Sequence, residues 1–311
     1  MKLEVNNITK SFGETNVLKG ISFSVESGKA LGLLGRNGAG KTTTIRILMD
    51  VFHADSGEIT LDDKPFEPRK VQIGYLPEER GLYPKRKVLE QMIYLAMLRG
   101  VSRKTASANA KRWLERLEVS QYQDRLLETL SKGNQQKVQL ASTLVCDPEI
   151  VILDEPFSGL DPVNSQILQE VVQELIRDGK IVIFSSHQMS YVEEFCEDIV
   201  IINHGEVVLS GHLDTIKRDF GKDQLVLSAL DLSPEEFTDQ LQSRLSDIVQ
   251  ITGQTKEDVI VRLNEGVSRR DLLVKLSQME DISMEHFETY KPSLNDIFVA
   301  RAGESHKKES L

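Results

Sequence analysis

The chain has very few cysteines, and their placement suggests neither a covalent framework nor a metal site. Cys146 and Cys196 are the only two; they stand far apart, and neither belongs to a CxxC or Cys/His grouping. Buried, reduced thiols are therefore expected at both positions.

Long hydrophobic runs are missing as well. No stretch approaches the roughly 18 apolar residues that a membrane-spanning helix needs, and no secretory apolar core follows residues 1–5. These absences predict a cytoplasmic chain that does not cross a membrane by itself.

Positive charge is in short supply. The 38 Lys and Arg residues are outnumbered by 48 Asp and Glu residues, which gives a net charge of −10. A general nucleic-acid binder normally shows a basic surface for phosphates, and unaided adhesion to anionic lipid needs one too, so neither function fits. The composition, with 40% apolar and 28% charged residues, is typical of a soluble globular protein. The length of 311 residues predicts one large and one small domain.

The chain up to about residue 220 alternates short β-branched runs with helical stretches, which is typical of an α/β fold with parallel strands. The clearest strand predictions cover residues 30–34, 149–153 and 180–184. Each of these runs ends in a polar turn, so we expect the chemistry at the strand ends, where open α/β sheets bind ligands.

Between residues 83 and 130 the hydrophobic spacing becomes helical. It predicts a helical insert with helices over 88–99 and 105–117. Trp113, Leu114 and Leu117 are expected to form one buried stripe.

Beyond residue 220 a new pattern begins. It predicts strands over 225–229, 248–254, 259–263 and 282–287, and helices over 234–245, 267–276 and 294–301. The order β-α-β-β-α-β is that of a ferredoxin-like unit. We therefore expect a first domain over 1–220 with a helical subdomain at about 83–130, a small α+β domain over 221–303, and a polar tail over 304–311.

The most specific motif is a glycine-rich loop. Residues 35–42 read Gly-Arg-Asn-Gly-Ala-Gly-Lys-Thr and match GxxxxGK[ST]. Such a loop places backbone N–H groups around a polyphosphate, while Lys41 adds a charge, Thr42 holds a magnesium ion and Thr43 offers a hydroxyl. A glycine-rich turn with a coincidental lysine is the alternative, and the apolar strand before the loop and the helix after it argue against that alternative.

A pair of carboxylates follows the apolar run 150–153. Asp154 is placed at the mouth of that strand to orient magnesium-bound water, and Glu155 can address the water that attacks a phosphate. Two adjacent acids at a strand end are also common on protein surfaces. Here the pair is followed by Pro156, Ser158, Gly159, Leu160 and Asp161, which favours the functional interpretation.

Three further motifs complete a set. Residues 130–134, Leu-Ser-Lys-Gly-Asn, resemble an LSGGQ signature; Gly159-Leu160-Asp161 resembles a D-loop; and Ser186-His187 matches a switch histidine. Together with the glycine-rich loop and the carboxylate pair, they make residues 1–220 similar to the nucleotide-binding subunit of an ABC transporter. The resemblance implies a P-loop NTPase fold, ATPase activity, and ATP and Mg²⁺ as ligands.

The resemblance also implies individual roles. Lys41 contacts the β- and γ-phosphates, Glu155 is the general base and His187 senses the γ-phosphate. Phe12 lies where the family places an aromatic ring against adenine, although an isolated Phe more often belongs to a core. The nucleotide-binding set implied in this way is Phe12, Val17, Gly35, Asn37, Gly38, Ala39, Gly40, Lys41, Thr42, Thr43, Glu78, Ser131, Gly133, Asn134, Asp154 and Asp161.

Some of these residues are expected to act between subunits. In the family, the signature of one subunit closes over ATP bound to the other, so Ser131 and Gly133 act in trans and Asp161 lies at the dimer seam. The resemblance therefore implies a homodimer or pseudo-homodimer with two nucleotides between the subunits.

The sequence departs from the family pattern at a few positions. Glu78 stands where a Gln is usual; as a carboxylate it still coordinates magnesium with Thr42 and Asp154, but it adds negative charge beside a polyphosphate. Lys132 and Asn134 replace the usual Gly and Gln of the signature, and Lys132 either adds a charge near the γ-phosphate or points to solvent. These substitutions, and the small domain that follows the cassette, are similar to the sodium- and drug-export (NatA-like) subgroup.

We therefore expect a peripheral ATPase on the inner face of the cell membrane that drives a separate integral-membrane permease, as an exporter. Family precedent gives residues 78–98 a role in docking that permease, whereas an ordinary helical lid is the simpler interpretation. Two alternatives stay open: a soluble, non-transport ABC ATPase that works on DNA or ribosomes, and a nucleotide-dependent regulatory module.

Overall fold

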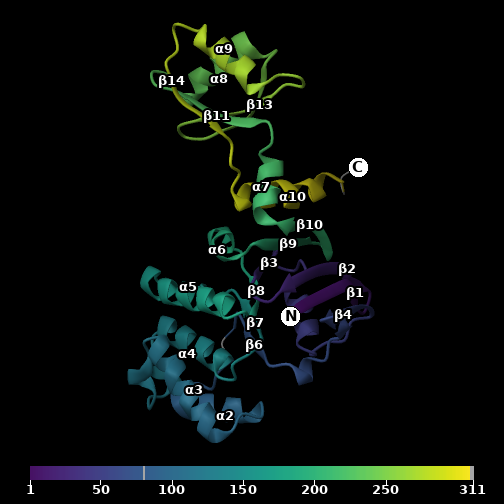
Figure 1. Ribbon diagram of the computed structural model, residues 1–311, viewed down its shortest axis with the longest axis vertical. Helices are drawn as coiled ribbons and strands as arrows, with labels where there is room; N and C mark the ends of the chain where they lie inside the picture. The colour runs from purple at the N-terminus through teal and green to yellow at the C-terminus, as the bar shows by residue number, and fades with distance from the viewer. Residues whose placement is uncertain (80, 309–311) are drawn as a thin grey trace. The chain divides into compact units, whose positions relative to one another are not determined.

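The computed structural model of the chain describes residues 1–79 and 81–308, with side chains up to residue 301. It divides into two compact units, which are treated separately below (Figure 1). The first comprises Met1–Leu213 together with residues 300–308, and the second is Asp214–Val299. The domain limits predicted near residues 220 and 303 stay predictions.

Strands and helices alternate in the first unit. Its strands are β1 (Lys2–Phe12), β2 (Thr15–Glu26), β3 (Ala30–Leu34), β4 (Ser56–Leu61), β5 (Lys64–Pro65), β6 (Ile73–Leu76), β7 (Ile150–Asp154), β8 (Ile181–Ser185), β9 (Asp198–Asn203) and β10 (Glu206–His212). Its helices are α1 (Lys41–Leu48), α2 (Val88–Leu98), α3 (Arg103–Arg116), α4 (Lys132–Leu144), α5 (Pro162–Arg177) and α6 (Met189–Phe195), with short 3₁₀ turns at Pro68–Lys70, Ser120–Tyr122 and Leu127–Thr129.

A six-stranded sheet carries the motifs. Its order is β10-β9-β3-β8-β7-β6, and every pairing is parallel except that of β10 with β9. The strands β3, β7 and β8 are buried at every residue, as their continuous apolar sequences require when helices or a second sheet cover both faces. Because β3, β6, β7 and β8 run in the same direction, the loops that follow them lie at one edge of the sheet. The α/β fold and this placement of the motifs were both predicted, and both are confirmed.

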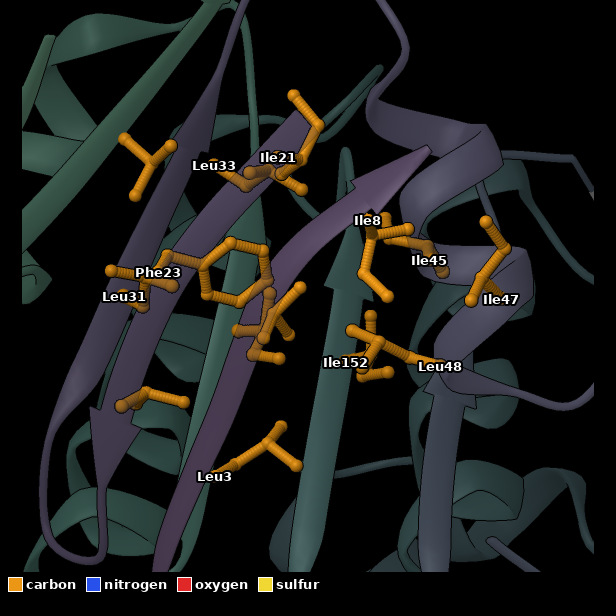
Figure 2. Close-up of a cluster of buried hydrophobic side chains, with 14 of the residues drawn as sticks. Leu3, Ile8, Ile21, Phe23, Leu31, Leu33, Ile45, Ile47, Leu48 and Ile152 are labelled. Carbon is orange, nitrogen blue, oxygen red and sulfur yellow. The ribbon is translucent and has the colours of Figure 1, made fainter. Parts of the chain in front are cut away.

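A four-stranded antiparallel sheet in the order β2-β1-β4-β5 packs on this core. Figure 2 shows Leu3, Ile8, Ile21 and Phe23 of β1 and β2 among side chains from β3, α1 and β7. All four side chains are buried. This apolar layer fixes α1, and with it the glycine-rich loop, against the end of β3.

The helical insert consists of α2 and α3, which lie next to α4 (Figure 1). Leu114 and Leu117 are fully buried, as predicted, and Trp113 is partly buried. Ser102 begins α3 by accepting a hydrogen bond from the backbone N–H of Thr105. The observed helices match the predicted ranges to within two residues at each end.

The second unit has the predicted β-α-β-β-α-β order. After α7 (Leu213–Phe220) it contains β11 (Gln224–Ala229), α8 (Pro234–Leu245), β12 (Val249–Gln254), β13 (Val259–Leu263), α9 (Arg269–Ser277) and β14 (Met284–Thr289). The strands form one antiparallel sheet in the order β12-β13-β11-β14, which is the ferredoxin-like arrangement. A capping box between Ser233 and Glu236 starts α8, and its apolar face, led by Phe237 and Leu241, forms the core with the sheet.

The last helix, α10 (Leu294–Lys308), runs seven residues past its predicted end at Arg301. Much of the predicted polar tail is therefore helical, and residues 309–311 lie outside the described part. No helix among the described residues combines the length and the hydropathy that crossing a bilayer requires.

Candidate active site

The glycine-rich loop joins β3 to α1. Gly40 precedes α1 with a φ of 116°, and a Cβ at this position would lie 2.6 Å from Cδ2 of Leu18, so only glycine fits. The Lys41 ammonium donates to the backbone oxygens of Gly35 at 2.7 Å and Arg36 at 3.3 Å. The loop therefore curls around its own lysine at the N-terminus of a helix, where backbone N–H groups favour an anion.

A cavity of about 440 Å³ opens beside this loop. Its lining combines the loop with Val17 near the start of β2, with the segment after β6 and with the end of β7. The residues around it are Val17, Arg36, Asn37, Gly38, Gly40, Lys41, Thr42, Thr43, Glu78, Asp154 and Glu155. All of them except Arg36 were predicted as site residues, so the fold brings together segments that are more than a hundred residues apart in the sequence.

Three carboxylates, those of Glu78, Asp154 and Glu155, line this cavity together with the basic side chains of Lys41 and Arg36. Asp154 is 4% exposed, Glu155 7% and Lys41 9%. Burial raises the pKa of Asp154, and the negative charges of Glu78 and Glu155 add to that effect, while Ser185 and Lys41 oppose it. Burial also lowers the pKa of Lys41 against the attraction of the same carboxylates. The lining therefore combines two buried carboxylates and the exposed carboxylate of Glu78 with a buried ammonium.

Glu155 is held by the segment that contains the switch histidine. One carboxylate oxygen accepts the backbone N–H of His187 at 2.8 Å and lies 2.8 Å from Nδ1 of its ring, and the other accepts the Ser186 hydroxyl at 3.1 Å. The backbone of Glu155 has a φ of 50°, and its N–H donates to the Ser185 oxygen at 2.8 Å. The predicted base and the predicted sensor are thus in direct contact.

Sequence reasoning missed the second layer around Asp154. Tyr75 on β6 lies close to Asp154. Burial, and to a smaller extent the charge of Asp154, raises the pKa of the Tyr75 phenol to about 12. Ser185 on β8 is fully buried and stands opposite Asp154 in the strand register. The only sequence signal was their place at the end of a strand, which many core residues share.

Phe12 stands apart from the cavity lining. Its side chain is 43% exposed and packs edge-on against Phe52, with ring centroids 5.2 Å apart. The Lys10 ammonium lies 5.5 Å from the centre of the Phe12 ring. Gly35 and Ala39 are buried residues of the loop, and they do not line the cavity either.

The signature residues form a second group. Ser131 caps α4 by accepting from the Asn134 N–H at 3.4 Å, and Asp161 caps α5 by accepting from the Asn164 N–H at 2.9 Å. A Cβ on Gly133 would lie 3.0 Å from the Asn164 side-chain nitrogen, so the two helix starts touch. None of these residues lines the cavity beside the glycine-rich loop.

Helix α4 is also bonded to the loop that carries Glu78. The Gln139 amide donates to the backbone oxygens of Pro77 at 3.3 Å and Glu79 at 3.1 Å. Thr143 donates to the Tyr75 oxygen at 3.2 Å. The signature helix and the segment after β6 are therefore one connected structure.

A glycine-rich loop at the end of a central parallel strand, with buried Asp and Glu at the end of a nearby one, defines a P-loop ATPase. Residues 18–158 match the family described as "ABC transporter", and residues 211–302 match "ATP-binding protein DrrA1-3-like, C-terminal domain". A solved structure of the ATP-binding subunit of an ABC transporter covers 71% of this chain and 94% of its own, with a TM-score of 0.65 and 30% identity.

Two relatives from Bacillus subtilis (strain 168) make the assignment specific. The chain is 40% identical to the uncharacterized ABC transporter ATP-binding protein YhaQ, over 97% of this chain and 98% of the relative. It is 36% identical to the ABC transporter ATP-binding protein NatA, over 64% of this chain and 83% of the relative. The chain therefore belongs to the ATP-binding proteins of the ABC transporter family. It is an ATPase subunit of an ABC transporter, as the motifs predicted, and its similarity to NatA confirms the predicted subgroup.

Proposed function

We propose that this subunit binds Mg-ATP in the cavity beside the glycine-rich loop and hydrolyses it with Glu155 as the general base. The observation that carries the proposal is the buried Glu155 carboxylate, which shares one cavity with Lys41 and the loop. Glu155 takes a proton from water as the water oxygen bonds to the γ-phosphorus, and the bond between that phosphorus and the β,γ-bridging oxygen breaks to release ADP. Lys41 and the loop N–H groups hold the β- and γ-phosphates through this step.

The donor set at this site fits magnesium. The Thr42 hydroxyl and the carboxylates of Asp154 and Glu78 are oxygen donors of the kind that Mg²⁺ prefers. No group of three or more His, Cys, Asp or Glu side chains in the described part of the chain could hold a metal alone. The phosphates of ATP would complete the ligand set, and the bound ion would neutralise their charge during transfer.

His187 is suited to report on the γ-phosphate because it already contacts the base. Its side chain is 65% exposed while Glu155, 2.8 Å away, is buried. A ring in this position reaches toward the cavity from outside while its backbone N–H keeps Glu155 oriented. Phe12, exposed beside Phe52, would stack on the adenine.

We propose further that two copies of the chain, or this chain and a similar one, enclose the nucleotide. Ser131, Gly133 and Asn134 at the start of α4 lie outside the cavity of their own chain. A hydroxyl, a glycine and a helix N-terminus suit contact with the phosphates held by a second chain, with Asp161 close by at the seam.

The insert offers a surface for the permease. A cavity of about 420 Å³ on α2 and the loop before it is lined by Tyr83, Arg86, Glu90, Gln91 and Tyr94. The Gln91 side chain is 2% exposed and bonds the backbone of Tyr83 and Arg86, which holds the loop in shape. Tyr83 and Tyr94 are more than half exposed. Exposed aromatic rings beside a preformed cavity favour docking of a partner helix over a simple lid.

We propose that the chain lies on the inner face of the cell membrane, where an integral-membrane permease holds it, and that it serves export, as the NatA-like subgroup favours. Affinity purification of the tagged chain from detergent-solubilised membranes tests it, with co-purified multi-span proteins identified by mass spectrometry. A multi-span partner that is captured and that stimulates ATP hydrolysis supports the proposal. A purely cytosolic pool bound to DNA, ribosomes or a small regulator would support the alternatives.

A further inference from the structure

The hydroxyl of Ser185 is a buried polar group that the fold leaves without a partner. Ser185 is the last residue of β8, and it is fully buried. Among the described residues, its Oγ is one of three buried side-chain polar atoms that make no hydrogen bond. Burial of a hydroxyl without a hydrogen bond costs free energy. An alanine would avoid that cost, so packing of β8 does not explain a serine at this position.

The strand register places this hydroxyl beside the Asp154 side chain. In the parallel pairing of β7 with β8, Ser185 is the partner of Asp154, and on its other side it pairs with Leu33 of β3. Paired residues of neighbouring strands point to the same face of a sheet, and the strands lie about 4.8 Å apart. The Ser185 hydroxyl therefore has a carboxylate on one side and an apolar side chain on the other.

This face of the sheet is the one that α1 covers. Ile152 lies two residues before Asp154 in β7, so the two side chains share the face. Ile152 packs with side chains of α1 in one buried cluster (Figure 2). Thr42, in the first turn of α1, lines the cavity together with Asp154. The hydroxyl thus lies on the side of the sheet where the proposed magnesium ligands meet.

The two residues after Ser185 already hold the other carboxylate of the pair. Ser186 donates its hydroxyl to Glu155 at 3.1 Å, and the backbone N–H of His187 donates to the same carboxylate at 2.8 Å. The backbone oxygen of Ser185 accepts the Glu155 N–H at 2.8 Å. Residues 185–187 are therefore fixed against the end of β7, and the hydroxyl among them that has no partner is the one beside Asp154.

We propose that Ser185 is a positioning residue of the metal site, whose hydroxyl donates to the Asp154 carboxylate and orients it for magnesium. This inference rests on the proposed function, in which Asp154 is a magnesium ligand. A hydrogen bond to a ligating carboxylate fixes its orientation and strengthens metal binding. Because both side chains are short and adjacent, rotation of the side chains is enough to form this bond, and the strands do not have to move.

The test measures how the binding of a fluorescent ATP analogue by the full chain depends on Mg²⁺, a readout that does not require hydrolysis. Ser185→Ala removes the hydroxyl, Ser185→Thr keeps it, and Ser165→Ala, at a buried position on α5, is the matched control. We expect Ser185→Ala to raise the Mg²⁺ concentration for half-maximal binding about tenfold, because a hydrogen bond to a metal ligand is lost. Ser185→Thr and Ser165→Ala should stay within about twofold of the unmodified chain.

Two further measurements separate positioning from a purely structural role. In EDTA, the unmodified chain and the three variants should bind the analogue equally, because the phosphates then depend on the glycine-rich loop and Lys41. The thermal unfolding midpoint of Ser185→Ala without nucleotide should not fall, because the substitution removes no hydrogen bond from the folded chain.

An unchanged Mg²⁺ requirement in Ser185→Ala would overturn the inference, and so would a Ser185→Thr variant that needs as much Mg²⁺ as Ser185→Ala. A lower unfolding midpoint in Ser185→Ala, or an equal loss of binding in EDTA, would make Ser185 a structural residue and overturn it as well. If the unmodified chain binds the analogue no better with Mg²⁺ than in EDTA, the proposed magnesium site has failed. A Mg²⁺-dependent chain in which Ser185→Ala changes nothing refutes the positioning role alone.

Discussion

Replacing Glu155 by glutamine separates the chemistry of this ATPase from its assembly. The carboxylate accepts the His187 N–H at 2.8 Å and the Ser186 hydroxyl at 3.1 Å. A glutamine oxygen still accepts the first of these, and its amide can donate to the hydroxyl, which turns to accept. The folded chain therefore loses only the charge-assisted part of these bonds, about 1–2 kcal/mol.

The loss of the proton acceptor is much larger. General base catalysis contributes roughly 10²–10⁴-fold in rate, which corresponds to about 2.7–5.4 kcal/mol in the barrier. We therefore expect Glu155→Gln to bind Mg-ATP normally, to hydrolyse it about 10²–10⁴-fold more slowly, and to accumulate as an ATP-bound dimer.

Phosphate release under saturating Mg-ATP measures the rate, and size-exclusion chromatography with and without ATP measures the dimer. Glu149→Gln is the matched control, because Glu149 is exposed and directly precedes the same strand. Unchanged phosphate release in Glu155→Gln would refute the base assignment, whatever happened to the dimer.

Three other substitutions test the remaining surfaces. Ser131→Arg should weaken ATP-driven pairing about 30-fold or more, which is the effect of losing an interface hot spot, while ATP binding persists. Sedimentation experiments measure the pairing. Ser102→Arg, at the N-cap of α3, is the control for the loss of a helix cap. Tyr94→Arg should abolish capture of a membrane partner without changing basal turnover, whereas Leu273→Arg, at an exposed apolar position of the second unit, should leave capture intact. Glu78→Gln should raise the Mg²⁺ concentration for half-maximal turnover about tenfold, because one carboxylate donor is lost; an unchanged magnesium titration would remove Glu78 from the metal site.

The elements that sequence patterns predicted well are those whose burial follows from local composition. The strand β3 was predicted at its observed bounds, and β7 and β8 each lie one residue later than predicted. Continuous runs of Val, Ile and Leu suit a strand that is covered on both faces, and the following loop is constrained by its glycines. These local constraints fixed most of the cavity around the nucleotide-binding loop.

What the sequence did not predict depends on contacts between distant segments. Lys137 is buried and Lys132 is exposed on the same helix, and the neighbouring sequence did not distinguish them. Tyr75 and Ser185 were missed because their roles follow from the strand order, which places β6 and β8 on either side of β7. The end of α10 was missed because polar sequence alone does not mark where a helix stops.

The bonds from Gln139 to Pro77 and Glu79 have a mechanical consequence. Gln139 lies in α4 and Ser131 caps the start of that helix, about 12 Å away along the axis at 1.5 Å per residue. A helix resists bending far more than a loop does, so α4 transmits a displacement from one point along its axis to another. A displacement of the segment after β6 would therefore tilt α4 and move Ser131. A displacement of Ser131 would move the segment after β6 in the same way.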